Sequence, residues 1–112
     1  MTCTQEKKAR IRELNDQLRQ SLTGGRIMMT SGVEALGQSV VSQLFDLLRR
    51  YNQFDEGNDP YGEHDFGAFD HSGQKFFWKI DCYDLSMEFH SEDASDPNKT
   101  VRVLTLMLAC EY

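Results

Sequence analysis

The residues best suited to chemistry lie in the segment 58–84, NDPYGEHDFGAFDHSGQKFFWKIDCYD. It combines carboxylates and histidines with aromatic residues that are typical of β-strands. Glu63, His64, Asp65 and Asp81 could gather around a divalent cation. Carboxylate oxygens with an imidazole suit Mn²⁺, Mg²⁺ or iron better than a structural zinc ion. One hypothesis is therefore a small metal-dependent hydrolase that uses these four residues.

The pairing of two expected strands decides which of these groups meet. The spacing predicts strands over 64–69 and 75–83, joined by a three-residue loop that begins with Asp70. This loop places Phe66 opposite Trp78 on a buried face. A two-residue loop would shift the register and exchange the residues that lie opposite each other.

The same register sets the role of the polar residues. The three-residue loop pairs Asp65 with Lys79 in a cross-strand ion pair, which is worth about 0.2–1 kcal/mol. The two-residue loop instead puts His64 opposite Asp81. Successive residues on a strand point to opposite faces, so His64 and Asp65 do not easily share one ion. Taken singly, each of these residues is better explained by a solvated sheet face than by a metal site.

Three aromatic residues are expected on the polar face of this hairpin. They are Phe69, Phe77 and Tyr83. Aromatic side chains are enriched at protein interfaces, so these residues predict a protein-binding patch. The alternative is that the first helix covers them.

Charge is distributed unevenly along the chain, whose net charge is −6. Residues 1–50 hold eight Lys and Arg against five Asp and Glu, whereas residues 51–112 hold four against thirteen. Most of the acidic residues lie in 55–96. Phosphates would be repelled, which disfavours direct nucleic-acid binding and favours a basic protein partner. The alternative is a solvated acidic face that only keeps the protein in solution.

The charge distribution favours a non-enzymatic binding or inhibitor protein without a cofactor. Its acidic surface would face a basic partner, and its carboxylates would stand in for phosphates if that partner binds nucleic acid. The candidate partner-binding carboxylates are Asp55, Glu56, Asp59, Glu92, Asp93 and Asp96.

We expect the helices and strands that carry these residues to form a single domain over 1–112. Apolar spacing, glycines and proline predict a helix over 4–22, a strand over 26–30, a helix over 32–52, an antiparallel meander over 64–89 and a helix over 97–111. The fold class is α+β, with a small, mainly antiparallel sheet packed against two or three helices. That sheet is a three-stranded meander, ending with a strand over 85–89, plus one short strand.

Two of these elements leave alternatives open. The first helix has a narrow apolar stripe of Ile11, Leu14 and Leu18, which suits either the domain edge or a homodimer through this helix. The last segment contains TVRVLTLML, which also alternates like a strand.

The cysteines and the N-terminal composition indicate a reducing compartment. Cys3, Cys82 and Cys110 lie far apart, without the spacing of a metal site. The first residues are charged where a signal peptide would be apolar, and no apolar run approaches the ~20 residues that span a bilayer. We therefore expect a cytoplasmic protein with free thiols and no membrane partner.

The order of several segments resembles a known family. These are RIRELNDQLR, LTGGRIMMTSGV, NDPYGEHDFGAF, FFWKIDCYD and RVLTLMLACEY. They are similar to a small bacterial family, typical of alphaproteobacteria and often plasmid-borne, that is catalogued as a domain of unknown function with a GEHDFGAF…FFWKID core. Members often carry two tyrosines after FFWKID, whereas Cys82 replaces the first one here, which makes Cys82 a poor candidate for a shared catalytic group.

The resemblance implies a compact cytoplasmic protein carried by mobile elements, without an activity to transfer. Together with the charge distribution, it favours an anti-defence inhibitor. Such an anti-CRISPR or anti-restriction protein would mimic nucleic acid and act on a basic, nucleic-acid-binding defence complex.

Overall fold

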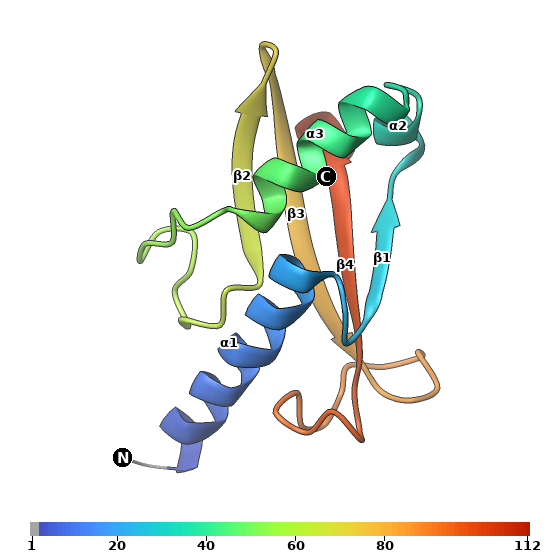
Figure 1. The fold of residues 1–112 in the computed structure, drawn as a ribbon. Coiled ribbons are helices and arrows are strands. Elements are labelled where there is room, and N and C mark those ends of the chain that lie inside the picture. Colours follow the sequence, from blue (N-terminus) through green and yellow to red (C-terminus); the bar gives the residue numbers. More distant parts are fainter. Residues whose placement is uncertain (1–2) are drawn as a thin grey trace.

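One sheet with α-helices packed on one of its faces makes up residues 3–112, which the computed structural model describes (Figure 1). Side chains are described from Gln5 onward. The helices are α1 (Cys3–Ser21), α2 (Ser31–Glu34), α3 (Gln38–Arg49) and the 3-10 turn η1 (Ala109–Glu111). The strands are β1 (Arg26–Met29), β2 (Phe66–His71), β3 (Gln74–Tyr83) and β4 (Val101–Leu108).

The four strands form one mixed sheet in the order β1-β4-β3-β2. β4 lies parallel to β1 and antiparallel to β3, and β3 pairs antiparallel with β2. The predicted α+β class is therefore confirmed. The sheet is four-stranded, and the prediction of a three-stranded meander plus one short strand is wrong.

The predicted helix over 97–111 is wrong, because residues 101–108 form the central strand β4. Leu104 pairs with Ile27 of β1 on one side and with Ile80 of β3 on the other. A central strand can be buried on both faces, so its sequence approaches a continuous apolar run. Periodicity alone does not separate such a run from a buried helix, which explains the error.

The predicted third strand of the meander, 85–89, is wrong as well, since these residues form a loop. The Asp84 carboxylate accepts hydrogen bonds from the Ser86 hydroxyl (2.8 Å) and from the backbone N–H of Glu88 (3.1 Å). Met87 takes a left-handed conformation with φ 59°. These local bonds satisfy backbone groups that a strand would offer to a neighbour.

The predicted continuous helix over 32–52 is also wrong, because the chain breaks between α2 and α3. Gly37 has φ 94°, a value that L side chains rarely adopt, and α3 begins directly after it. The break lets α3 turn its apolar stripe onto the sheet, where Leu44 and Leu48 are fully buried.

The β2–β3 hairpin closes with a two-residue loop, Ser72-Gly73, in place of the predicted three-residue loop. His71 pairs with Gln74 at the end of the ladder. Ser72 (φ 52°) and Gly73 (φ 79°) are both left-handed, as a type I′ turn requires. The twist of this turn matches the strands, so it is favoured over the longer loop.

This register changes which side chains meet. Phe66 pairs with Lys79, and Gly67 takes the position opposite Trp78. The predicted Phe66–Trp78 pair is therefore wrong. The indole of Trp78 instead lies over Gly67, where the missing side chain leaves room for it.

The hydrophobic core lies between the sheet and the helices α1 and α3, which cover the same face (Figure 1). Its buried members include Leu18, Val33, Leu44, Leu48, Phe76, Trp78, Ile80, Leu104 and Leu106. Neither α1 nor α3 covers the opposite side of the sheet, which we call the open face.

We predict that Gly67→Ala destabilises the domain. A Cβ at this position would lie 2.4 Å from Nε1 of Trp78 and 2.8 Å from the Tyr51 ring, so a packed core must shift. Overpacking of this kind costs about 1–3 kcal/mol of unfolding free energy. Urea unfolding followed by the fluorescence of Trp78, the single tryptophan, measures it.

Gly57→Ala is the control, because its new Cβ would meet only the flexible Asp55 carboxylate at 3.2 Å. It should change the unfolding free energy by less than about 0.5 kcal/mol. Equal stability of the two variants would contradict the packing described for Gly67.

Candidate protein-binding surface

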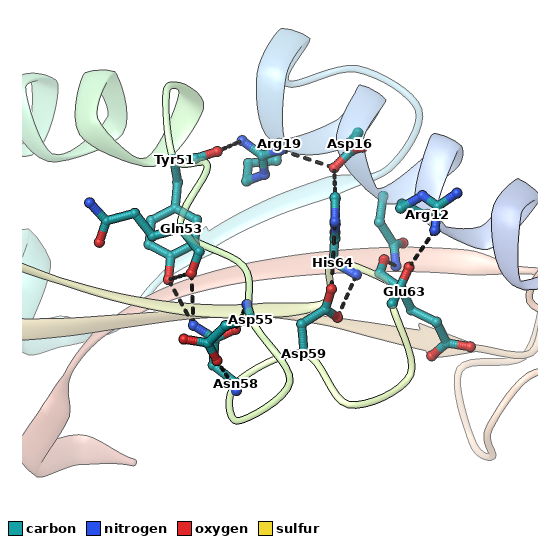
Figure 2. A network of polar contacts seen from close by, with 12 residues as sticks. Arg12, Asp16, Arg19, Tyr51, Gln53, Asp55, Asn58, Asp59, Glu63 and His64 are labelled. Carbon is teal, nitrogen blue, oxygen red and sulfur yellow. Dashed lines mark hydrogen bonds and ion pairs between the residues drawn. The ribbon is translucent and has the colours of Figure 1, made fainter.

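The loop between α3 and β2 packs against α1 through His64 (Figure 2). Its Nδ1 lies 2.8 Å from a carboxylate oxygen of Asp16 in α1, and its Nε2 lies 3.5 Å from Asp59 in the loop. The imidazole stacks on Phe54 with ring centroids 3.7 Å apart. His64 therefore joins the first helix to the loop, and its ring nitrogens face two carboxylates that the metal hypothesis did not include.

Arg19 of α1 lies beside Asp16 and is buried, with 2% of its surface exposed. Its guanidinium donates to the backbone carbonyls of Arg49 (3.2 Å) and Tyr51 (2.8 Å) at the C-terminal end of α3, and to Asp16 (3.0 Å). A cation here satisfies carbonyls left free by the helix end and interacts favourably with the helix dipole. The position of an arginine next to the apolar stripe of the helix is the one sequence signal for this burial.

Further contacts join α1 to two loops rich in Asp and Glu, residues 50–65 between α3 and β2 and residues 84–100 between β3 and β4, which we call the acidic loops. Arg12 donates to the carbonyl of Gly62 (3.2 Å), and Lys7 lies 3.8 Å from the Asp93 carboxylate. Asn15 links the helix to the sheet, because it accepts a hydrogen bond from buried Arg102 of β4 (2.9 Å). Part of the acidic segment is thus held by the basic helix inside the same molecule.

Three of the predicted partner-binding carboxylates have structural roles. The Asp59 side chain is only 6% exposed and accepts a hydrogen bond from the backbone N–H of His64 (3.0 Å). Asp93 accepts from the backbone N–H of Ser95 (3.1 Å) in its own loop. Asp96 accepts from the N–H of Asn98 (2.9 Å). These three groups shape the loops rather than stand free in solvent.

The other three carboxylates remain on the surface. Asp55, Glu56 and Glu92 are exposed, and the Glu92 side chain is 82% exposed. Asp55 also accepts the backbone N–H groups of Gly57 and Asn58, which fixes its position in the turn. Glu92 lies 4.0 Å from Lys99 in an exposed ion pair, which a charged partner can displace at little cost.

The four residues of the metal hypothesis are not brought around one position. Among the side chains that the structure describes, no three His, Cys, Asp or Glu groups are placed to hold a metal ion together. Asp81 pairs with Lys79 at 3.1 Å, so the predicted Asp65–Lys79 pair is replaced. The hydrolase stays a prediction from the sequence that the geometry does not support.

Two carboxyl groups of that set nevertheless have perturbed acidity. Burial, followed by the charge of Asp65, raises the pKa of Glu63. Burial also raises the pKa of Asp65, and the charges of Asp59 and Asp81 add to the effect. Burial of these two carboxylates, together with the negative charge around them, therefore costs stability at neutral pH.

The open face contains a groove of about 600 Å³ that runs over β1, β4 and β3. Its apolar lining is Met28, Tyr83, Met87, Val103 and Met107. Val103 and Met107 are 4% exposed, although no α-helix of the described chain packs on this face. The groove is therefore formed by side chains that pack on one another.

Hydrogen bonds fix one end of this groove. Glu111 accepts bonds from the Thr30 hydroxyl (2.6 Å), the Gly32 N–H (3.2 Å) and the Leu108 N–H (2.9 Å). The adjacent Tyr112 ring packs edge-on against other rings of the open face, including Phe77 at 5.4 Å. The Glu111 hydrogen bonds join the start of α2 to the end of β4.

The three predicted interface aromatics do not share one face. Tyr83 lines the groove, and Phe77 lies on the same open face beside Tyr112. Phe69 lies on the covered face, where it stacks on Phe76 with centroids 5.8 Å apart and packs against the core. The expectation for Phe69 is therefore wrong, because the two-residue loop shifted the register by one residue.

The fold and these surfaces define an α+β domain with an uncovered sheet face and acidic loops. A family model named DUF3768, protein of unknown function, matches residues 29–111. The chain belongs to this family. Comparison with curated proteins and with solved structures gave no match. None of the helices described here has the length and apolar character needed to cross a bilayer.

Substitution of Arg19 by methionine tests the contact between α1 and α3. We expect a loss of about 3 kcal/mol in unfolding free energy, because the α3 carbonyls lose a buried charged donor. Urea unfolding provides the measurement. Arg10→Met is the control, since that side chain is 45% exposed and should have little effect. Equal stability of the two variants would refute the role given to Arg19.

The raised pKa values of Glu63 and Asp65 predict the sign of a pH effect. The native state holds these protons more tightly than the unfolded state does. Their contribution to the unfolding free energy therefore decreases as pH rises from the ordinary values of 4.5 and 3.8 through the raised native values. Glu63→Gln and Asp65→Asn should gain stability relative to the wild type between pH 4 and neutral pH.

The measurement is urea unfolding at several pH values, with Glu92→Gln as the control. Asp84, Asp93 and Glu111 have lowered pKa values and act in the opposite direction, but the variants leave them unchanged. Parallel curves of unfolding free energy against pH for the three variants would show that the burial and charge around Glu63 and Asp65 do not affect stability.

Proposed function

We propose that this protein is a non-enzymatic binding protein that presents an acidic surface to a basic protein partner. The supporting observation is the unequal burial of charge. Arg19 and Arg102 are 2% and 3% exposed, whereas the carboxylates Asp55, Glu56 and Glu92 remain in solvent. Two cationic side chains are thus withdrawn from the surface, while these three carboxylates remain there to attract a cationic protein.

In its narrower form, the partner is a nucleic-acid-binding defence protein, and the chain acts as an anti-CRISPR or anti-restriction inhibitor. The exposed carboxylates of the two loops would then occupy phosphate positions of the displaced nucleic acid. The mobile-element association implied by the family resemblance supports this form.

A matched pair of charge reversals tests the proposal. One triple variant reverses exposed carboxylates of the acidic loops and combines Asp55→Lys, Glu56→Lys and Glu92→Lys. The control reverses three exposed carboxylates elsewhere, Glu6, Glu34 and Asp46, with the same change in net charge. Proteins from the native host that the wild type captures are purified. Each is then titrated by calorimetry with the wild type and with both triple variants, at low and at high salt.

We expect a captured protein with a basic surface, whose affinity falls about tenfold or more with the loop reversals and with rising salt. The control reversals should change the affinity less than about threefold. Capture of no protein, or binding that is insensitive to salt and equal in both triple variants, would contradict the proposal. For the narrower form, the wild type should compete with nucleic acid for the captured partner, and the loop variant should not.

A further inference from the structure

The groove on the open face has a methionine-rich lining. Three of the five methionines of the chain, Met28, Met87 and Met107, line it from three different segments. Methionine is flexible and polarisable, and it is over-used at surfaces that receive apolar side chains of a partner. Met28 is 55% exposed, so this lining reaches solvent.

The strand pairing restricts the form that an occupant can take. β4 and β3 are central strands whose backbone groups pair with neighbours on both sides. β1, which contributes Met28, is an edge strand, but its unpaired backbone groups lie in the plane of the sheet whereas the groove lies on the face, so an occupant of the groove meets mainly side chains. A helix satisfies its own backbone hydrogen bonds and packs by side chains alone, as α1 and α3 already do on the covered face. A helix on the open face would complete a third layer.

The charged residues at the groove indicate the sign of the charge expected on its occupant. Lys79 is paired with Asp81 at 3.1 Å, which leaves the carboxylate of Glu111 as the remaining charge of the lining. The adjoining turn adds Asp84 and Glu88 on either side of Met87. A helix with lysine or arginine beside its apolar stripe is complementary to this arrangement.

We propose that the groove on the open face is the docking site for a basic amphipathic helix of the partner protein. This inference rests on the proposed function and adds the surface and the element that bind. The carboxylates of the reversal experiment, Asp55, Glu56 and Glu92, do not line the groove, so the two proposals depend on different residues.

Nuclear magnetic resonance of ¹³C-methyl methionine tests the site directly. The probe is a synthetic amphipathic helical peptide of leucine and lysine, and its control replaces every lysine with glutamate. We expect the leucine–lysine peptide to shift the methyl signals of Met28, Met87 and Met107. Met29 should not shift, because it does not line the groove although it is 39% exposed.

Two neighbouring residues of β1 provide matched variants. Met28→Asp places a carboxylate in the groove, whereas Met29→Asp places one on an exposed side chain outside it. Fluorescence anisotropy of the labelled peptide should show about tenfold weaker binding to Met28→Asp, because an unpaired charge must be desolvated. Met29→Asp should bind within about twofold of the wild type. Both variants retain the buried core, and circular dichroism checks their folding.

Several outcomes would overturn the inference. These are no binding of the leucine–lysine peptide, equal binding of the leucine–glutamate peptide, equal effects of Met28→Asp and Met29→Asp, or methyl shifts spread over Met29 as well. A wild-type dimer by light scattering that Met28→Asp dissociates would assign the groove to a second copy of the chain. If these tests fail while the loop reversals still weaken capture of the basic partner, the proposed function stands and only the docking site is wrong.

Discussion

The buried guanidinium of Arg19 is the interaction on which the arrangement of this domain depends. It joins α1 to the C-terminal end of α3 and to Asp16, and Asp16 in turn holds His64 (Figure 2). The Nη1 and Nη2 groups of Arg19 find acceptors although its buried Nε does not, and burial of this charge is favourable only while α1, α3 and the following loop pack together. They place both long helices on one face of the sheet and leave the opposite face without an α-helix (Figure 1).

This arrangement separates two kinds of acidic residue. Those at the contact between α1 and the loop, such as Asp16 of the helix and Asp59 of the loop, are paired with His64. Others, such as Glu56 and Glu92, remain exposed, and Glu92 lies in an exposed ion pair 4.0 Å from Lys99. A charge map of the sequence counts both kinds alike, although only the second kind can attract a partner. The functional proposal therefore depends on a smaller set of carboxylates than the sequence indicated.

Local signals predicted part of the fold. The glycine-terminated first helix and the α+β class followed from apolar spacing and turn residues, and so did the buried Trp78. The last segment was assigned to a helix although its alternation left a strand open, because the apolar residues of a central strand resemble those of a buried helix. The hairpin loop was also mispredicted, since Asp70 suits a three-residue turn but the Ser72-Gly73 pair formed the tighter one. That single shift moved Phe69 into the core region and brought Phe66 to the open face.

The candidate site was harder to predict, because it depends on contacts between distant segments. Met28, Met87 and Met107 come together only through the parallel pairing of β1 with β4 and a turn held by Asp84. Nothing in the spacing of these residues indicates a shared groove. In the same way, the pairing of His64 with Asp16 removed it from the metal set that its sequence neighbours suggested.

We propose that the covered face of the sheet is structural and that the partner binds on the open face and the exposed loops. Hydrogen–deuterium exchange of the protein with and without its captured partner distinguishes these surfaces. We expect exchange to slow on binding in the turn around Met87 and in the loop around Glu56, and to stay unchanged in α1 and α3. Slowing confined to α1 and α3, with no change in those loops, would contradict it.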